Sequence, residues 1–152
     1  APIAVVLHDH AAAKARGLAI ERHQAGAFLG AQQRAGGRVA KTIEAVAEAL
    51  TLAKKSGVDV AKVRQALLGG FAASKVLEVH GQRVIDRNFK PGFKMKLHRK
   101  DMGIAMQTAK EKGVTMPAAE VIAKQMDRAI CEQGGEVDHS ALGVVIEGMA
   151  GL

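Results

Sequence analysis

TIEAVAEALTLAKKSGVD, residues 42–59, sets the architecture of most of this chain. Its apolar residues recur three or four positions apart, as they do along one face of an α-helix; they are Ile43, Val46, Ala47, Leu50 and Ala53. Lys54 and Lys55 fall in the last turn and Gly57 follows them, which is a common way for a helix to end. The stretch therefore predicts an amphipathic helix that begins near Thr42 and stops before Gly57.

The helical pattern continues toward the C-terminus. Asp59 and Ser74 stand where helix N-caps are expected, and Pro117 suits the first turn of a later helix. No alternating apolar pattern typical of strands occurs in the sequence after residue 42. The further segments predicted to be helical are 59–70, 74–87, 94–112, 116–133 and 139–151, with NFKPGF, residues 88–93, as a loop. We therefore predict one all-helical domain over residues 42–152.

Residues 1–41 have a different character, with many Ala, Gly, Arg and His residues and weak periodicity. IAVVL, residues 3–7, fits a short strand and residues 10–30 fit a helix, and the pattern does not choose between these structures. The segment is too short for a complete dinucleotide-binding domain and has no GxGxxG motif. We treat it as an irregular N-terminal segment, either a degenerate remnant of a preceding domain or part of an interdomain connection.

Composition narrows the class of protein. Hydrophobic residues make up 48% of the chain, which excludes a disordered protein, and aromatic residues only 3%, so the core must be aliphatic. The single Cys131 excludes an internal disulfide framework and cysteine-based metal sites, and it favours a reducing compartment, so we expect a cytoplasmic protein. No apolar run approaches the ~20 residues that cross a membrane. The net charge of +7 suits anionic ligands, polyanions or simple solubility, and does not choose among them.

FKPGFKMKLHRKD, residues 89–101, concentrates positive charge at the start of the predicted helix 94–112. At about 100° per residue, Asp101 falls with Leu97 and Ile104 on a strip that we expect to face the core, and Lys100 falls at its border. The solvated side is formed by Lys96, Arg99 and Lys110. A second apolar strip is formed by Met95, Met102 and Met106, so we expect this helix to pack on two sides.

A carboxylate on a core-facing strip needs a partner, because an unpaired buried charge costs several kcal/mol. Asp101 therefore either makes an internal ion pair that orders the helix, or belongs with Lys100 at the rim of a cleft that takes an anionic or carbonyl ligand. The residue pattern alone leaves both interpretations open.

Histidines invite a metal interpretation, which their spacing does not favour. His80, His98 and His139 are far apart in sequence, with no HxxxH pair and no cysteine partner, so we predict no metal site. Asp138, His139 and Ser140 are adjacent in sequence and cannot form a hydrolase triad with one another. We expect a helix cap at this position.

Several motifs in combination resemble the helical C-terminal domain of β-hydroxyacid dehydrogenases. They are AEAL-x-LA-x-K-x-GVD, then ALLGG, PGF, the KD pair and DHSAL, and the resemblance covers about 110 residues, from Thr42 to the end. The branches that it resembles most are 2-hydroxy-3-oxopropionate reductase and 3-hydroxyisobutyrate dehydrogenase. The resemblance implies an all-α, multi-helix domain like the C-terminal domain of 6-phosphogluconate dehydrogenase-type enzymes.

The resemblance also implies an activity. Members of the family move a hydride between NAD or NADP and a small β-hydroxyacid or its semialdehyde, and the cofactor crosses the cleft between this domain and a Rossmann domain. Lys100 matches the lysine of the KD pair beside the nicotinamide, and Phe93 matches the phenylalanine of PGF near the same ring. We assign Asp101 a structural role, anchoring the helix that presents Lys100. Gly70 and Ser74 match a region near the substrate, where a supporting role or a plain helix stop and N-cap are the alternatives.

The family's catalytic lysine, the general acid that protonates the carbonyl oxygen during reduction, belongs to a GxxGxGxxxKxxxN motif. QQRAGGRVAK, residues 32–41, matches it through Gly37 and the final VAK, which makes Lys41 the candidate. Ala45 replaces the asparagine, and TIEAVAEAL follows about nine residues sooner than the resemblance implies, which shifts Lys41 by roughly 13 Å relative to Lys100. A solvent-exposed lysine without a catalytic role is the alternative.

Two functions compete. The first is the helical part of an NAD(P)-dependent oxidoreductase, with little or no activity unless a Rossmann domain is present. The second is a non-catalytic helical dimerisation or assembly module, because the family's C-terminal domains form oligomers; we expect a homo-oligomer in either case. Nucleic-acid binding is not expected, because aromatic stacking residues and a reading helix are lacking, and no membrane partner is expected.

Overall fold

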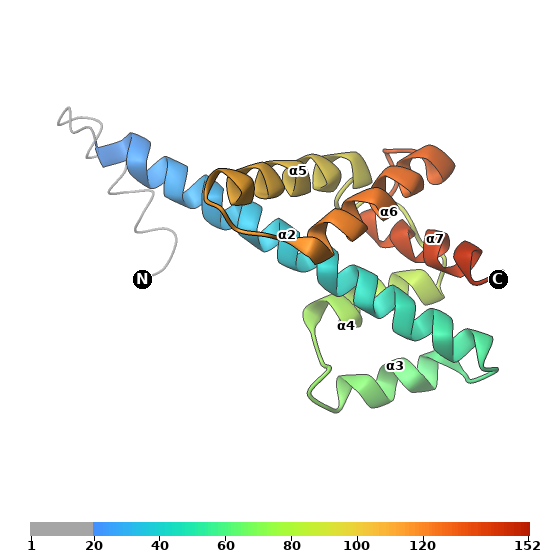
Figure 1. Ribbon diagram of the computed structural model, residues 1–152. Coiled ribbons are helices and arrows are strands. Elements are labelled where there is room, and N and C mark those ends of the chain that lie inside the picture. The colour runs from blue at the N-terminus through green and yellow to red at the C-terminus, as the bar shows by residue number, and fades with distance from the viewer. Residues whose placement is uncertain (1–19) are drawn as a thin grey trace.

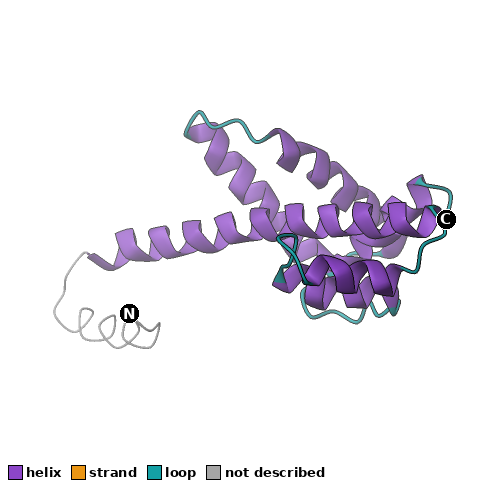
Figure 2. Cartoon of the chain, turned by 90° about the horizontal axis from the view of Figure 1, so that it is seen from below, coloured by secondary structure: helices purple, strands orange, loops and turns teal. Residues whose placement is uncertain are grey.

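The computed structural model describes residues 20–152, with side-chain surroundings from residue 36 onward. Regular structure within that part is helical throughout, apart from one isolated bridge between Lys94 and Asp138 (Figure 2). The helices are α2 (Ile20–Lys55), α3 (Val60–Leu68), α4 (Lys75–Ile85), α5 (Met95–Glu111), α6 (Pro117–Gln133), the short 3-10 helix η1 (His139–Ala141) and α7 (Leu142–Met149). The all-α prediction is confirmed, while IAVVL lies outside the described residues.

Helix α2 is the central helix, against which most of the others pack. It runs diagonally through Figure 1, with α5, α6 and α7 on one side and α3 and α4 on the other. It packs against α4, α5 and α7. Its most buried residues include Ala40, Ile43 and Ala47, and the small side chains of the two alanines let the neighbouring helices approach closely. The helix that bears Lys41 is therefore the one against which α5, the helix of Lys100, is packed.

The core is aliphatic and rich in methionine. Its main cluster joins α2, α5, α6 and α7 and includes Met95, Met102, Met126, Leu142 and Val145. A smaller cluster between α2 and α4 contains Val46, Leu50 and Leu77. Full burial of such a side chain stabilises the fold by roughly 1.5–3 kcal/mol. The aliphatic core predicted from the scarcity of aromatic residues is confirmed.

The helix ends follow the predicted capping residues. The Asp59 carboxylate accepts hydrogen bonds from the Ala61 and Lys62 amides at the start of α3. Ser74 Oγ accepts from the Leu77 amide at the start of α4. After α2, Gly57 adopts a φ of +73°, a conformation that residues with a Cβ rarely adopt. These local signals are legible in sequence because each depends only on neighbouring residues.

The first helix begins far earlier than predicted. α2 runs from Ile20 without a break through Thr42, the expected start. The prediction of an irregular segment is therefore wrong for residues 20–41, and the proposed boundary after Lys41 does not interrupt the helix. The Ala- and Gly-rich sequence there lacks the strong apolar spacing that reveals a helix packed along one face.

The predicted core-facing strip of α5 is also wrong. Met95 and Met102 are fully buried, and His98 and Ala105 share their face, whereas Leu97 and Ile104 are 39% and 37% exposed. The second apolar strip of the sequence analysis is thus the one that enters the core. The strip centred on Leu97 lies on the surface, and it carries Asp101 with it.

Candidate functional site

Two residues singled out from sequence lie on the exposed side of α5 and the loop before it. Phe93 directly precedes Lys94, the N-cap of α5, and Lys100 lies in the second turn of the helix. Phe93, Leu97 and Ile104 are all exposed large hydrophobic residues. Leu97, Lys100 and Ile104 are three and seven positions apart and lie along one side of α5, whereas Phe93 precedes the helix and packs against His98 and His139. An ammonium group thus stands within an uncovered apolar strip.

Lys100 and Asp101 contact each other and form no buried pair. The Lys100 Nζ lies 3.7 Å from Asp101 Oδ1, and the side chains are 64% and 31% exposed. Asp101 sits where α5 crosses α2, because a Cβ added to Gly36 would lie 3.6 Å from the Asp101 Cβ. An ion pair this exposed contributes ~0–1 kcal/mol. It leaves the Lys100 ammonium accessible to a ligand.

The loop that carries Phe93 is held by one buried carboxylate. Asp138 Oδ2 accepts hydrogen bonds from the Gly92 and Phe93 amides at 2.8 and 3.1 Å. Its Oδ1 accepts from the Ser140 amide at 3.0 Å and from Ser140 Oγ at 2.6 Å. The Arg83 guanidinium lies 3.7 Å from Oδ2. We call this fully buried Asp138 with its donors the Asp138 hub.

The hub is favourable for a negative charge. Burial by itself would raise the pKa of Asp138, but contacts from His80, Ser140 and the Phe93 amide outweigh burial and hold that pKa below its ordinary value. The carboxylate therefore stays ionised while it fastens the PGF loop to the start of η1. The predicted helix cap at this position is confirmed, because Asp138 caps η1 through the Ser140 amide.

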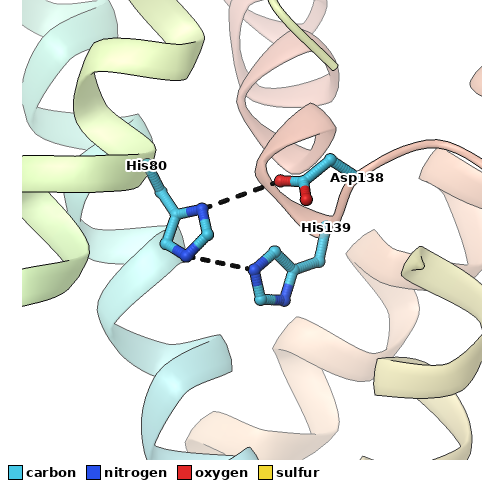
Figure 3. Close-up of side chains that lie close together, drawn as sticks. All are labelled: His80, Asp138 and His139. Carbon is cyan, nitrogen blue, oxygen red and sulfur yellow. Dashed lines mark hydrogen bonds and ion pairs between the residues drawn. The ribbon is translucent and has the colours of Figure 1, made fainter. Parts of the chain in front are cut away.

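Three histidines that are distant in sequence form a continuous chain beside this hub. His98 Nε2 lies 2.9 Å from the Gly36 carbonyl oxygen, and His98 Nδ1 lies 2.8 Å from His139 Nδ1. His139 Nε2 lies 3.2 Å from His80 Nε2. His80 Nδ1 then lies 3.6 Å from Asp138 Oδ1 (Figure 3). The chain links α2, α5, η1 and α4 to the hub.

The histidine rings also form the seat of Phe93. The Phe93 ring packs edge-on against His98 and His139, with 5.6 Å between ring centroids in each case. Burial, together with the neighbouring histidines, lowers the pKa of His139 to about 3. Burial likewise lowers the pKa of His98. Both rings are therefore neutral near pH 7, as a closely packed support for Phe93 requires.

The cluster also bears on the prediction of no metal. His80, Asp138 and His139 each offer a ligand atom, and these atoms lie within 4.8 Å of one another. Both oxygens of Asp138 already accept from amide or hydroxyl donors, and both ring nitrogens of His139 are in hydrogen bonds. Because these hydrogen bonds already occupy the Asp138 oxygens and His139 nitrogens that would have to bind an ion, the absence of a metal site stays our prediction.

Sequence reasoning missed this cluster because its members meet only through tertiary packing. One signal was available: His98 stands three residues after Met95 and four before Met102, on the methionine strip of α5. A histidine on an apolar face requires a polar partner from another element. The identity of that partner, the Gly36 carbonyl and His139, does not follow from spacing.

The remaining candidate residues lie on other elements. Lys41 is partly buried on α2, one turn after Gly37, a position that faces Met102 of α5. Gly70 is exposed in the loop between α3 and α4, and Ser74 is the N-cap of α4.

A pocket of about 520 Å³ lies between α5 and α6, but its lining includes neither Phe93 nor Lys100.

Comparison with known proteins identifies the family. A family described as "NAD-binding of NADP-dependent 3-hydroxyisobutyrate dehydrogenase" matches residues 38–146. The chain belongs to this family. The match covers all helices from the middle of α2 through most of α7, including Lys100, Phe93 and the Asp138 hub.

Curated relatives agree with this assignment. The chain is 48% identical over 112 residues to 2-hydroxy-3-oxopropionate reductase of Escherichia coli, covering 74% of this chain and 38% of that protein. It is 32% identical over 110 residues to a probable mitochondrial 3-hydroxyisobutyrate dehydrogenase-like protein of Arabidopsis thaliana, covering 72% and 33%. The chain thus spans less than two fifths of the length of these relatives.

Solved structures agree on the fold. The 3-hydroxyisobutyrate dehydrogenase of Salmonella typhimurium aligns with a TM-score of 0.72 at 23% identity, over 76% of this chain and 40% of that one. The Mycobacterium tuberculosis 3-hydroxyisobutyrate dehydrogenase aligns with a TM-score of 0.68 at 25% identity, over 76% of this chain and 42% of that one.

Within residues 20–152, no helix combines the length and apolarity needed to cross a membrane.

Proposed function

We propose that this chain supplies the helical wall of the active site of an NAD(P)-dependent oxidoreductase that acts on a small β-hydroxyacid or its semialdehyde. Lys100 and Phe93 contact the nicotinamide end of the cofactor in this proposal. The observation that carries it is the exposed strip of α5, in which Lys100 stands between Leu97 and Ile104 and follows the partly exposed Phe93 of the preceding loop, in a chain of this family. The relative from E. coli makes 2-hydroxy-3-oxopropionate the first substrate to test.

The chemistry assigns a role to each residue. A bound NAD(P) cofactor would supply the hydride for reduction of the semialdehyde carbonyl, or would accept one from the hydroxyl-bearing carbon in the reverse reaction. The Lys100 ammonium would fix the nicotinamide end by hydrogen bonding, and the Phe93 ring would limit where that end can lie. Lys41 is the candidate general acid for the carbonyl oxygen, with a lysine of no catalytic role as the alternative. Ser74 and Gly70 would support the substrate side, and Asp101 would anchor α5, the helix that presents Lys100.

The cofactor requires more than these helices. Residues 20–152 contain no sheet of the kind that holds the adenosine and pyrophosphate of a dinucleotide. A polypeptide of only these 152 residues should therefore reduce 2-hydroxy-3-oxopropionate slowly or not at all. Turnover at ordinary enzyme rates, on the order of 1–1,000 per second, would contradict this expectation.

A chimaera tests the role of Lys100. Residues 38–152 replace the matching part of the E. coli relative, and the reduction of 2-hydroxy-3-oxopropionate is followed with NADH and NADPH. Lys100→Ala should lower kcat/KM at least tenfold, because it removes a charged contact worth about 1.5–3 kcal/mol. Lys110→Ala, on the same helix and also exposed, should stay within twofold. A folded, active chimaera that tolerates Lys100→Ala excludes the proposed cofactor contact.

The second candidate function is an assembly module. α3 buries none of its residues fully, and Phe71 in the loop after it is fully exposed. Apolar side chains this exposed often mark an interface with another copy or domain. Light scattering over a concentration series measures the mass of the particle. A monomer at every concentration rejects this function, and an active chimaera that loses activity in Lys100→Ala favours the oxidoreductase proposal over it.

A further inference from the structure

The contacts of the histidine chain determine where its protons are. The Gly36 carbonyl oxygen can only accept a hydrogen bond, so His98 Nε2 must carry the proton of that 2.9 Å contact. A neutral His98 then has a bare Nδ1, which accepts from a protonated His139 Nδ1 at 2.8 Å. The His139 Nε2 is bare in turn and accepts from a protonated His80 Nε2 at 3.2 Å. One fixed acceptor on α2 thereby sets the tautomer of all three rings.

The chain ends in a contact that lacks a proton. With three neutral rings, His80 Nδ1 would present a bare lone pair to the ionised Asp138 Oδ1 at 3.6 Å. This nitrogen is buried and has no hydrogen-bond partner among the described residues. Two bare acceptors facing each other in a buried place repel, and an unsatisfied buried polar atom costs about 1–3 kcal/mol. One added proton on Nδ1 converts the repulsion into an imidazolium–carboxylate pair (Figure 3).

We propose that His80, His139 and His98 form one imidazole chain that carries a single excess proton at His80, and that this proton ties α4 to the Asp138 hub beneath Phe93. Three neutral imidazoles supply three protons to three hydrogen bonds, and the fourth proton is the one that Asp138 attracts. His139 and His98 serve as positioning residues, each fixed in one tautomer.

The charged groups around the chain agree with this placement. Burial lowers the pKa of both His139 and His98, so a second proton is excluded from the interior rings near pH 7. Asp138 favours positive charge next to it, while Arg83 of α4, which contacts Asp138 Oδ2, disfavours it. At the other end of the chain, the negative charge of Asp101 on α5 partly opposes the effect of burial on the pKa of His98. His80 is the ring in contact with the Asp138 carboxylate, and its side chain is 19% exposed.

The arrangement has a consequence for Phe93. Its ring packs on the edges of His98 and His139, and its amide donates a hydrogen bond to Asp138. Loss of the excess proton therefore loosens both the Asp138 hub and the packing of the Phe93 ring on the histidines. The proton would therefore control the position of Phe93. The relevance of this control to a cofactor depends on the function proposed above, whereas the proton arrangement itself does not.

Nitrogen NMR of the histidine side chains tests the proposal without any cofactor. In ¹⁵N-labelled protein at pH 7, protonated and bare ring nitrogens give well separated signals. We expect His98 to be protonated only at Nε2, His139 only at Nδ1, and His80 at both nitrogens. Single His→Gln variants at 80, 98 and 139 assign the signals. A neutral His80, a charged His98 or His139, or the opposite tautomer at either interior ring overturns the proposal.

Removing the carboxylate gives a second readout. Asp138→Asn keeps the size of the side chain but removes its charge, so His80 should lose its excess proton at pH 7 while His139 keeps its tautomer. Asp127→Asn removes an exposed carboxylate that pairs with Arg99 instead, and should leave all three rings unchanged. A His80 that stays doubly protonated in Asp138→Asn contradicts the proposal. If that variant fails to fold, the spectrum of the unmodified protein decides alone.

Discussion

Glu44 is a side chain whose surroundings oppose its ordinary charge. It lies on α2 with 7% of its surface exposed, and its Oε2 has no hydrogen-bond partner among the described residues. Burial raises the pKa of Glu44 to about 7, and the negative charge of Glu48, one turn further along, adds to the effect. The helix thus tolerates a carboxyl group at this position mainly in its neutral form.

The first prediction concerns Glu44→Gln. Below pH 4.5 the carboxyl group is protonated in both states and contributes no difference. Between pH 4.5 and 7 the folded state keeps a proton that the unfolded state has lost, so stability falls as pH rises. Glu44→Gln removes this loss and should raise the free energy of unfolding by roughly 3 kcal/mol at pH 8, with little change near pH 4. Urea denaturation at both pH values measures it.

Glu120→Gln is the matched control. Glu120 is exposed on α6 and does not contribute to the pKa shift of Glu44, so its replacement should change stability by only a few tenths of a kcal/mol at either pH. A Glu44→Gln variant whose stability follows the same pH dependence as the unmodified chain would show that the buried carboxyl group titrates normally.

At the residue scale, interactions between neighbours in sequence could be predicted, and interactions between distant residues could not. Asp59, Ser74 and Asp138 were recognised as caps because a cap bonds to an amide two or three residues away. The hydrogen bonds from Gly92 and Phe93 to Asp138 cross more than forty residues, and no local pattern announces them. Lys100, Phe93, Lys41, Ser74 and Gly70 therefore stay predictions of function, carried by a family resemblance and not by their surroundings.

Helix α7 shows how one element depends on a close approach. A Cβ added to Gly143 would lie 3.1 and 3.2 Å from the two Val84 methyl carbons of α4. A Cβ added to Gly148, later on the same helix, would meet nothing within 4 Å. The two glycines share a helix and differ in what lies opposite.

The second prediction is that Gly143→Ala and Gly148→Ala act in opposite directions. Gly143→Ala forces α7 away from α4 and should destabilise the protein by about 1–3 kcal/mol. Gly148→Ala only reduces the freedom of the unfolded chain and improves helix propensity, so it should stabilise by about 0.4–1 kcal/mol. Thermal unfolding of both variants measures the difference. Equal effects would mean that α7 and α4 are not packed as described.

Prediction of the elements succeeded where apolar spacing and caps coincided, as in α3, α4 and α6. It failed for the face of α5, because the helical spacing of Leu97 and Ile104 indicates a core-facing strip, whereas the structure exposes both residues. The core instead takes the flexible Met95 and Met102, which fill irregular space between α2 and α6. In our proposal the exposed Leu97 and Ile104 belong to the wall of a cleft.

The whole molecule combines an aliphatic core with a polar chain that runs beside it. The main cluster unites α2, α5, α6 and α7, while His98, His139 and Asp138 are buried between α4, α5 and η1. Unfolding exposes these histidines to water, where each regains an ordinary pKa near 6.5. The global stability of the protein is therefore coupled to pH through groups that lie beneath the candidate site.

The third prediction is acid destabilisation that depends on His139. The folded state keeps His139 neutral until about pH 3, while the unfolded state takes up a proton near pH 6.5. The contribution of His139 to stability is complete above pH 6.5 and is lost as pH falls toward 3. The loss amounts to roughly 2–3 kcal/mol by pH 4.5.

Glu44 titrates with the opposite sign over pH 4.5–7, so the comparison belongs in the Glu44→Gln background. There, adding His139→Gln should flatten the fall in the free energy of unfolding between pH 7 and 4.5. The fall that remains reports His98, whose pKa is also lowered by burial. Parallel pH profiles with and without His139 would mean that this ring is protonated in the folded state, and the imidazole chain would then lose its neutral centre.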